Sequence, residues 1–256
     1  MSVILEAKNV SKHYGDYRAL QEVNLSFSGG ETVAVVGPNG AGKTTLVNVL
    51  TGLLKPTHGQ VLFRGTSIAG IGPVKLARLG MSRAFQLVHI FPELTVLEAI
   101  AAAVISQQGR NFDFWRCASS IDAVRLRAVE VAKIFGLHRR LDWLASYLSQ
   151  GEKKLLDIAS AFALNPQVIL LDEPTSGISS SDKRGLMDTL MEAARKAGIK
   201  TMLLVEHDMD LIAEYSTRIV ALTEGRVLAD MPPATFFADP ELTAAIVGKP
   251  PAHLKA

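Results

Sequence analysis

With 256 residues, the chain is long enough for one large α/β domain and does not require two independent domains. Its 27 Lys and Arg against 25 Asp and Glu give a formal net charge of +2, which excludes a broad basic field for holding nucleic acid. The single cysteine excludes an intramolecular disulfide framework, and the six histidines lack the spacing of a zinc site.

The start of the chain and its apolar runs bear on membrane insertion. Glu6 and Lys8 interrupt the apolar stretch that a signal peptide needs, and the longest apolar runs fall far short of the roughly 20 residues that cross a bilayer. We therefore expect a soluble protein without an export signal, which could still bind a membrane protein.

The first predicted elements are a strand, a glycine loop and a helix. A β-branched run from Thr32 to Val36 predicts the strand, which stops at Gly37. The helix is indicated by apolar residues at i, i+3, i+4 and i+7, namely Leu46, Val49, Leu50 and Leu53. A further strand is predicted for residues 60–63.

Two later apolar runs, Val168 to Leu171 and Thr201 to Val205, are typical of strands buried on both faces of a parallel sheet. Ser181 to Ala197 has helical composition and ends at Gly198, which predicts a strand-helix-strand crossover. The segment from about Leu94 to Leu148 differs, because it is rich in Ala, Leu, Arg and Val and lacks an obvious strand.

We interpret that segment as a helical insertion, with helical periodicity around Ile121 to Phe135 and a loop at Gly109 to Trp115. The tail after Pro232 is interpreted as a short docking extension.

Residues 37–44, Gly-Pro-Asn-Gly-Ala-Gly-Lys-Thr, match the phosphate-loop pattern G-x-x-x-x-G-K-[ST] between a predicted strand and a predicted helix. Glycines let main-chain N–H groups converge on phosphates, Lys43 adds a charge near the β and γ oxygens, and Thr44 offers a hydroxyl to Mg²⁺. A plain glycine-rich turn is the weaker alternative, because both flanks fit. The predicted nucleotide-binding residues here are Gly37, Pro38, Asn39, Gly40, Ala41, Gly42, Lys43, Thr44 and Thr45.

The apolar run at 168–171 delivers two carboxylates, Asp172 and Glu173, at its carboxyl end, where ligands of open α/β sheets bind. Alone, such a pair is often a strand meeting solvent. Beside a phosphate loop, we predict that Asp172 holds Mg²⁺ and that Glu173 orients and deprotonates the attacking water.

These motifs and the pentapeptide Leu148-Ser-Gln-Gly-Glu152, which lies between them in the chain, resemble the ATPases of ABC transporters over nearly the whole chain. The resemblance implies an α/β phosphate-loop NTPase (RecA-like) core with a mixed sheet and an N-terminal antiparallel β portion. It implies core residues 1–93 and 155–256, with an extension at 232–256, and an inserted helical subdomain at 94–154.

The same resemblance implies roles for single residues and for Mg²⁺ and ATP as cofactors. Tyr14 would stack on adenine, Gln86 would reach Mg²⁺ and the attacking water, and His207 would contact the γ-phosphate. Ser149 and Gly151 would contact ATP bound to a second ATPase subunit, identical or a related paralogue. By itself the pentapeptide could be an ordinary helix N-cap.

Two residues depart from the family pattern, and they leave two alternatives open. Glu152 replaces the commonest glutamine, and Ser179 stands where many relatives have an aspartate that crosses the dimer. The alternatives are an ABC ATPase outside transport and a nucleotide-binding regulatory module; long coiled-coil insertions are absent, and Glu173 and His207 are present.

Residues 83–98 and 239–248 are most similar to the ATPases of branched-chain and hydrophobic amino acid uptake, with urea, short amides and aromatic acids as alternative cargoes. The implied partners are transmembrane permease subunits and an extracytoplasmic substrate-binding protein, with the chain on the cytoplasmic face of the membrane. An apolar cluster is predicted either to line a groove for a permease helix or to pack internally: Leu87, Val88, Ile90, Phe91, Leu94 and Val96.

Overall fold

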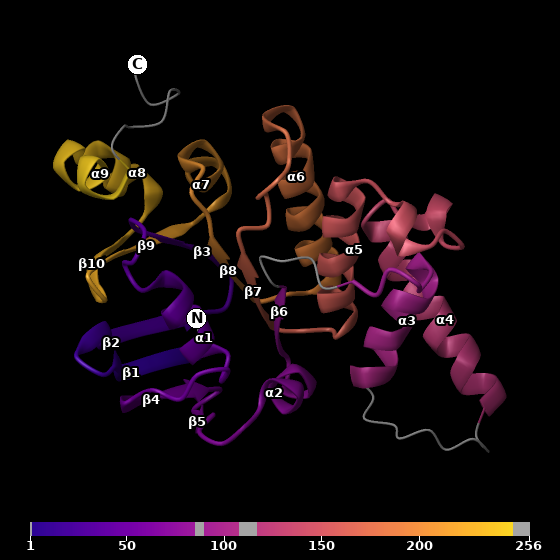
Figure 1. The fold of residues 1–256 in the computed structure, drawn as a ribbon, viewed down its shortest axis with the longest axis horizontal. Coiled ribbons are helices and arrows are strands. Elements are labelled where there is room, and N and C mark those ends of the chain that lie inside the picture. The colour runs from indigo at the N-terminus through magenta and orange to yellow at the C-terminus, as the bar shows by residue number, and fades with distance from the viewer. Residues whose placement is uncertain (1, 85–89, 108–116, 248–256) are drawn as a thin grey trace. The chain divides into compact units, whose positions relative to one another are not determined.

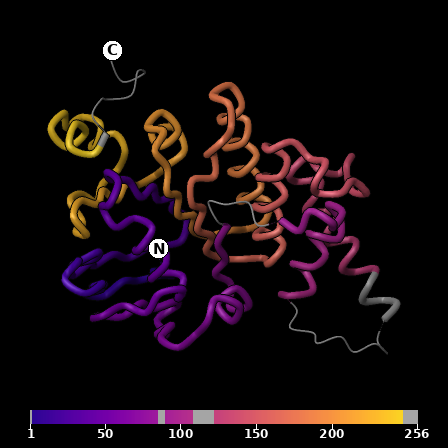
Figure 2. Tube along the Cα trace, in the orientation of Figure 1, coloured from indigo at the N-terminus to yellow at the C-terminus, as the bar shows by residue number. Residues whose placement is uncertain are grey.

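The computed structural model describes residues 2–84, 90–107 and 117–247 (Figure 1). The chain divides into two compact units, which we call the first and the second unit. The first comprises Met1–Leu76, Leu170–Glu173 and Lys200–Ala256, and the second comprises Ala77–Ile169 and Pro174–Ile199. Figure 2 shows how the first unit combines the indigo start of the chain with its yellow end.

The first unit contains the predicted antiparallel β portion, a sheet of order β2-β1-β4-β5. Its strands are β1 (Val3–Tyr14), β2 (Tyr17–Ser28), β4 (His58–Phe63) and β5 (Thr66–Ser67). In β2 the buried Val23, Leu25 and Phe27 alternate with polar residues, the period-2 pattern of a strand with one core face. The strands β1 and β2 form a hairpin that pairs Tyr14 with Tyr17.

The second sheet of the first unit is the predicted mixed one. Strands β3 (Glu31–Val36), β8 (Thr201–Val205) and β9 (Arg218–Thr223) are parallel, and β10 (Arg226–Met231) runs antiparallel to β9. The strand order is β10-β9-β3-β8-β7, with β7 at Val168–Asp172. The apolar runs at 168–171 and 201–205 are therefore buried strands, as predicted.

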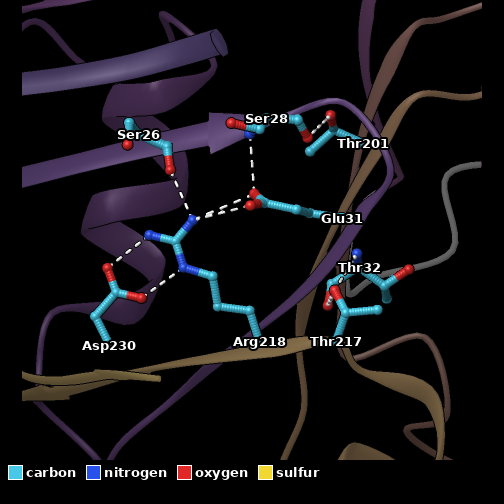
Figure 3. A network of polar contacts seen from close by, with 8 residues as sticks. All are labelled: Ser26, Ser28, Glu31, Thr32, Thr201, Thr217, Arg218 and Asp230. Atoms are coloured by element: carbon cyan, nitrogen blue, oxygen red, sulfur yellow. Dashed lines mark hydrogen bonds and ion pairs between the residues drawn. The ribbon is translucent and has the colours of Figure 1, made fainter. Parts of the chain in front are cut away.

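A polar network in the first unit joins strands that are far apart in the sequence (Figure 3). The Arg218 guanidinium binds both carboxylate oxygens of Asp230, at 2.5 and 2.6 Å, and the Glu31 carboxylate at 3.2 Å. It also donates to the Ser26 carbonyl oxygen at 2.8 Å. One side chain thus ties β9 to β10, β3 and β2.

Helix α1 (Lys43–Leu50) follows β3, as predicted, but it ends before Leu53. That part of the prediction is wrong: Gly52 has φ 70°, the left-handed conformation that ends helices, and Leu53 is 40% exposed. The other helices of this unit are α7 (Met209–Tyr215), α8 (Pro233–Ala238) and α9 (Pro240–Val247), and α2 (Pro73–Leu79) continues into the second unit.

The segment interpreted as a docking extension begins with two packed helices that the sequence analysis did not assign. Phe236 and Phe237 of α8 and Ile246 of α9 share a buried cluster with Ile219 and Ala221 of β9. Residues 233–247 are therefore part of the first unit's core, and a docking role for the tail stays a prediction.

The second unit is mainly helical in the region predicted as the insertion. It contains β6 (Met81–Ala84), α3 (Val96–Gln107), α4 (Cys117–Ile134), α5 (Gln150–Ala163) and α6 (Ser180–Ala197). Two short 3-10 turns, η1 (His138–Arg140) and η2 (Ala145–Tyr147), precede α5.

Helices α3, α4 and α5 pack against one another, with Phe162 of α5 edge-on to Phe135 at 5.0 Å between ring centroids. The crossover helix ends at Gly198, as predicted. The loop predicted at 109–115 lies outside the described residues. The division into two units does not test the subdomain bounds 94–154, which stay a prediction.

Within residues 2–84, 90–107 and 117–247, no helix has both the length and the apolar composition needed to cross a membrane.

Candidate nucleotide-binding site

The phosphate loop lies between β3 and α1 and needs glycine at two positions. Gly37 has φ 151° and Gly42 has φ 101°, a range that side chains with a Cβ rarely adopt. A Cβ added to Gly37 would lie 2.3 Å from the Leu222 carbonyl oxygen, and one added to Gly42 would lie 2.5 Å from the Ala19 carbonyl oxygen. The loop is therefore wedged against two other segments of the first unit.

Lys43, at the start of α1, is only 7% exposed. Its ammonium donates to the carbonyl oxygens of Gly37 at 2.6 Å and Pro38 at 3.0 Å, so it is held over the loop. Burial lowers the pKa of Lys43, and the charges of Glu173 and Asp172 oppose that shift. The two carboxylates and this cation thus share one electrostatic environment.

Asp172 and Glu173 follow the buried strand β7, and the backbone aims the second carboxylate. Glu173 has φ 49°, and its N–H donates to the Val205 carbonyl oxygen at 2.8 Å. Its Oε1 lies 2.9 Å from Nε2 of His207, a half-exposed residue that follows β8. The structure therefore brings together two predicted site residues that are 34 positions apart.

The hairpin of β1 and β2 carries Tyr14, which is 47% exposed, with the Lys12 ammonium 5.2 Å from the centre of its ring. Across the turn, the Tyr17 hydroxyl donates to the Gly40 carbonyl oxygen of the phosphate loop at 3.1 Å. Tyr17 was not among the predicted site residues. A signal existed, because the Tyr14-Gly-Asp-Tyr17 spacing suits a two-residue hairpin turn that pairs both tyrosines.

The predicted signature residues belong to the second unit, where Ser149 is the N-cap of α5. Ser149 Oγ accepts from the Glu152 N–H at 3.3 Å, while Glu152 Oε2 accepts from the Ser149 N–H and hydroxyl, both at 2.9 Å. This is a capping box, so the N-cap interpretation is correct as local structure. Gly151 follows in the first turn of the helix.

Ser179 is the N-cap residue of α6, and its hydroxyl donates to Asp182 Oδ2 at 2.6 Å. This contact lies within one chain and does not test a contact of Ser179 across a dimer.

The chemistry of the side chains near the phosphate loop fits Mg²⁺. Thr44 and Asp172 are hard oxygen donors, and Mg²⁺ is usually held by one or two carboxylates together with substrate phosphates and water. Among the residues that the structure describes, no group of three or more His, Cys, Asp or Glu is arranged to hold a metal. Gln86, the third predicted metal ligand, lies outside the described residues.

The fold and this set of residues define a phosphate-loop ATPase. The family model for the ABC transporter matches residues 20–176, more than half of the chain, and the chain therefore belongs to the ABC transporter ATPase family.

Several of its relatives are named for branched-chain amino acid transport. The chain is 34% identical over 254 residues to the high-affinity branched-chain amino acid transport ATP-binding protein LivG of Escherichia coli, covering 96% of this chain and 98% of that protein. It is 33% identical to the corresponding protein BraF of Pseudomonas aeruginosa, with the same coverage. It is thus an ATP-binding cassette and an ATPase, homologous to the ATPases of branched-chain amino acid importers.

Solved structures agree. A nucleotide-free ATP-binding cassette from an ABC transporter has a TM-score of 0.82 and 28% identity, covering 95% of this chain and 98% of that one. A cassette in its ADP conformation has a TM-score of 0.83 and 27% identity, covering 97% and 100%. A dimeric cassette bound to ADP and phosphate has a TM-score of 0.75 and 30% identity, covering 90% and 98%.

Proposed function

We propose that this chain is the ATP-hydrolysing subunit of an importer for branched-chain or other hydrophobic amino acids. It works on the cytoplasmic face of the membrane, bound to transmembrane permease subunits that receive cargo from an extracytoplasmic substrate-binding protein. The names of LivG and BraF support this cargo class. Urea, short amides and aromatic acids are the alternative cargoes.

The observation that carries the proposed catalysis is the 2.9 Å contact between Glu173 and His207, in the same unit as the phosphate loop. In this proposal Glu173 accepts a proton from the attacking water, and His207 fixes the carboxylate and contacts the γ-phosphate. An inactive regulatory module would have no need for that pair.

Binding uses donors that the phosphate loop already positions. The Lys43 ammonium exchanges the Gly37 and Pro38 carbonyl oxygens for β and γ phosphate oxygens, and the N–H groups at the start of α1 face the phosphates. Tyr14 stacks on adenine. Thr44, Asp172 and Gln86 would hold Mg²⁺, which would supply positive charge to offset the charge that develops on the phosphates.

Two copies of the chain, or this chain and a paralogue, close on two ATP molecules. Ser149 and Gly151 of each copy contact the γ-phosphate bound to the other. Hydrolysis removes that contact and lets the copies part, which moves the docked permease helices.

Purification of the chain from native membranes, followed by reconstitution into vesicles, tests the proposed function. We expect a permease and a binding protein to copurify, and the vesicles to take up leucine, isoleucine or valine only with ATP. Selective uptake of urea, amides or aromatic acids would replace the cargo assignment. A chain that copurifies with ribosomes or DNA-repair proteins instead would contradict the transport function.

A further inference from the structure

The segment before α5 carries an ion pair that the proposed function does not yet use. Arg140, the last residue of η1, places its Nε 2.5 Å from Oε1 of Glu152. Its guanidinium also lies over the Trp143 ring, 4.3 Å from the centre. The guanidinium is therefore fixed on two sides, by a carboxylate and by an aromatic face.

The two oxygens of Glu152 have separate partners. Oε1 faces Arg140, whereas Oε2 accepts both the N–H and the hydroxyl hydrogen of Ser149. Partial burial would by itself raise the pKa of Glu152, but the bonds from Ser149 and the charge of Arg140 lower it overall. The Glu152 carboxylate thus accepts a hydrogen bond from the same Ser149 hydroxyl that is proposed to contact the γ-phosphate.

If Ser149 contacts the ATP of a second copy, as the proposed function has it, the γ-phosphate and the Glu152 carboxylate compete for the same hydroxyl. The serine hydroxyl has one hydrogen, and in this structure it is donated to Glu152. A γ-phosphate that takes this hydrogen would also come close to the Glu152 carboxylate, because both groups contact one oxygen atom. Two anions at such a distance repel each other unless a cation offsets one of them.

We propose that Arg140 is the positioning residue that resolves this conflict: it holds Glu152 in the helix cap and offsets its charge, so that Ser149 can accept a partner's triphosphate. In this role Arg140 touches neither the nucleotide nor the attacking water. In chains with glutamine at position 152 the neutral amide would keep the cap without the repulsion, and the arginine would be dispensable.

A double-mutant cycle in a Glu173→Gln background tests the proposal. This substitution is expected to slow turnover, so that the ATP-bound dimer accumulates. Sedimentation velocity with ATP and Mg²⁺ measures dimerisation of four proteins, all of which carry Glu173→Gln. They are the reference with no further change, Arg140→Met, Glu152→Gln, and the variant with both of these substitutions. Arg139→Met, which removes the exposed neighbouring arginine, is the matched control. Binding of a fluorescent ATP analogue to monomers checks that each variant folds.

We expect Arg140→Met to weaken the dimer about tenfold or more, the scale of one uncompensated like-charge contact, and Arg139→Met to leave it unchanged. In the Glu152→Gln background the same Arg140 substitution should change dimerisation less than about threefold. A purely structural role on Trp143 would give equal losses in both backgrounds and would overturn the inference. So would Arg140→Met with an unchanged dimer constant, while a reference that never dimerises with ATP would overturn the proposed function itself.

Discussion

Glu173 occupies a backbone conformation that few non-glycine residues adopt, at φ 49°, directly after a fully buried strand. That conformation and the bond from its N–H to Val205 place its carboxylate on His207. A residue held in an uncommon conformation at a strand end is a candidate for function, because the surrounding structure must stabilise it.

Glu173→Gln keeps the size of the side chain and its hydrogen-bonding capacity but removes the proposed base. We expect unchanged ATP affinity and turnover slowed by roughly 10² or more. Phosphate release measured at saturating ATP checks this. Glu224→Gln is the control, because Glu224 has a similar φ of 50° and is exposed; turnover of Glu173→Gln within a few-fold of the parent would refute the assignment.

Two glycines of the phosphate loop allow strain and overlap to be separated. Gly40 has φ 81° and open space around an added Cβ, whereas Gly42 has φ 101° and the Ala19 carbonyl oxygen in the way. We expect Gly40→Ala to cost about 1–2 kcal/mol of unfolding free energy and Gly42→Ala roughly 1–3 kcal/mol more. Denaturant unfolding without nucleotide measures both; equal losses would show that the overlap relaxes.

Local chemistry decides which single residues the sequence could predict. The phosphate loop was predictable because its residues are neighbours in the chain and each position has a separate requirement. The spacing of Tyr14 and Tyr17 predicts a hairpin turn, but the contact of Tyr17 with the phosphate loop depends on how that hairpin packs. Arg140 was not predictable, because it lies in a short 3-10 turn that has no periodic pattern. The predicted roles of Gln86, His207 and Ser149 came from resemblance and stay predictions.

At the scale of elements, buried strands and amphipathic helices were predictable from apolar runs and spacing. The end of α1 was missed, because Leu53 continues the apolar pattern beyond the glycine that ends the helix. Helices α8 and α9 were missed because each is short and begins at a proline, so their apolar residues looked like a tail. Packing on β9, which the sequence does not display, orders them.

The Arg218 side chain joins four strands and contacts residues up to 192 positions away in the chain. Arg218→Met would leave Glu31 and Asp230 facing each other without their cation, so we expect a loss of about 1–3 kcal/mol of unfolding free energy. Arg195→Met is the control, because Arg195 is 72% exposed in its pair with Glu192 and should be replaceable without measurable change. Equal stability of both variants in urea titrations would mean that the network contributes nothing.

At the scale of the whole molecule, the proposed role in transport requires a surface that contacts the permease. Of the predicted apolar cluster, Phe91 is 66% exposed, whereas Val96 is fully buried and therefore packs internally rather than lining a groove. Leu87 and Val88 lie outside the described residues. The exposed Phe91 side chain is the better candidate for a partner contact.

Phe91→Ser should therefore uncouple the ATPase from transport: ATP binding by the isolated chain should stay within about twofold, while ATP-driven uptake in vesicles falls about tenfold or more. Val96→Ser, at the buried position, should instead destabilise the chain by about 2 kcal/mol or more. Loss of ATP binding in Phe91→Ser would show that this residue supports the fold.

ATP binding at the phosphate loop is the step on which every other proposed role depends. Equilibrium titration of ATP with Mg²⁺ into the purified chain and into Lys43→Ala tests it, with circular dichroism to show that both are folded. We predict saturable binding at millimolar concentrations or below for the parent and affinity lowered about tenfold or more by Lys43→Ala, since one charge-assisted phosphate contact is lost. Failure of the parent to bind ATP, or unchanged binding by folded Lys43→Ala, would contradict the account.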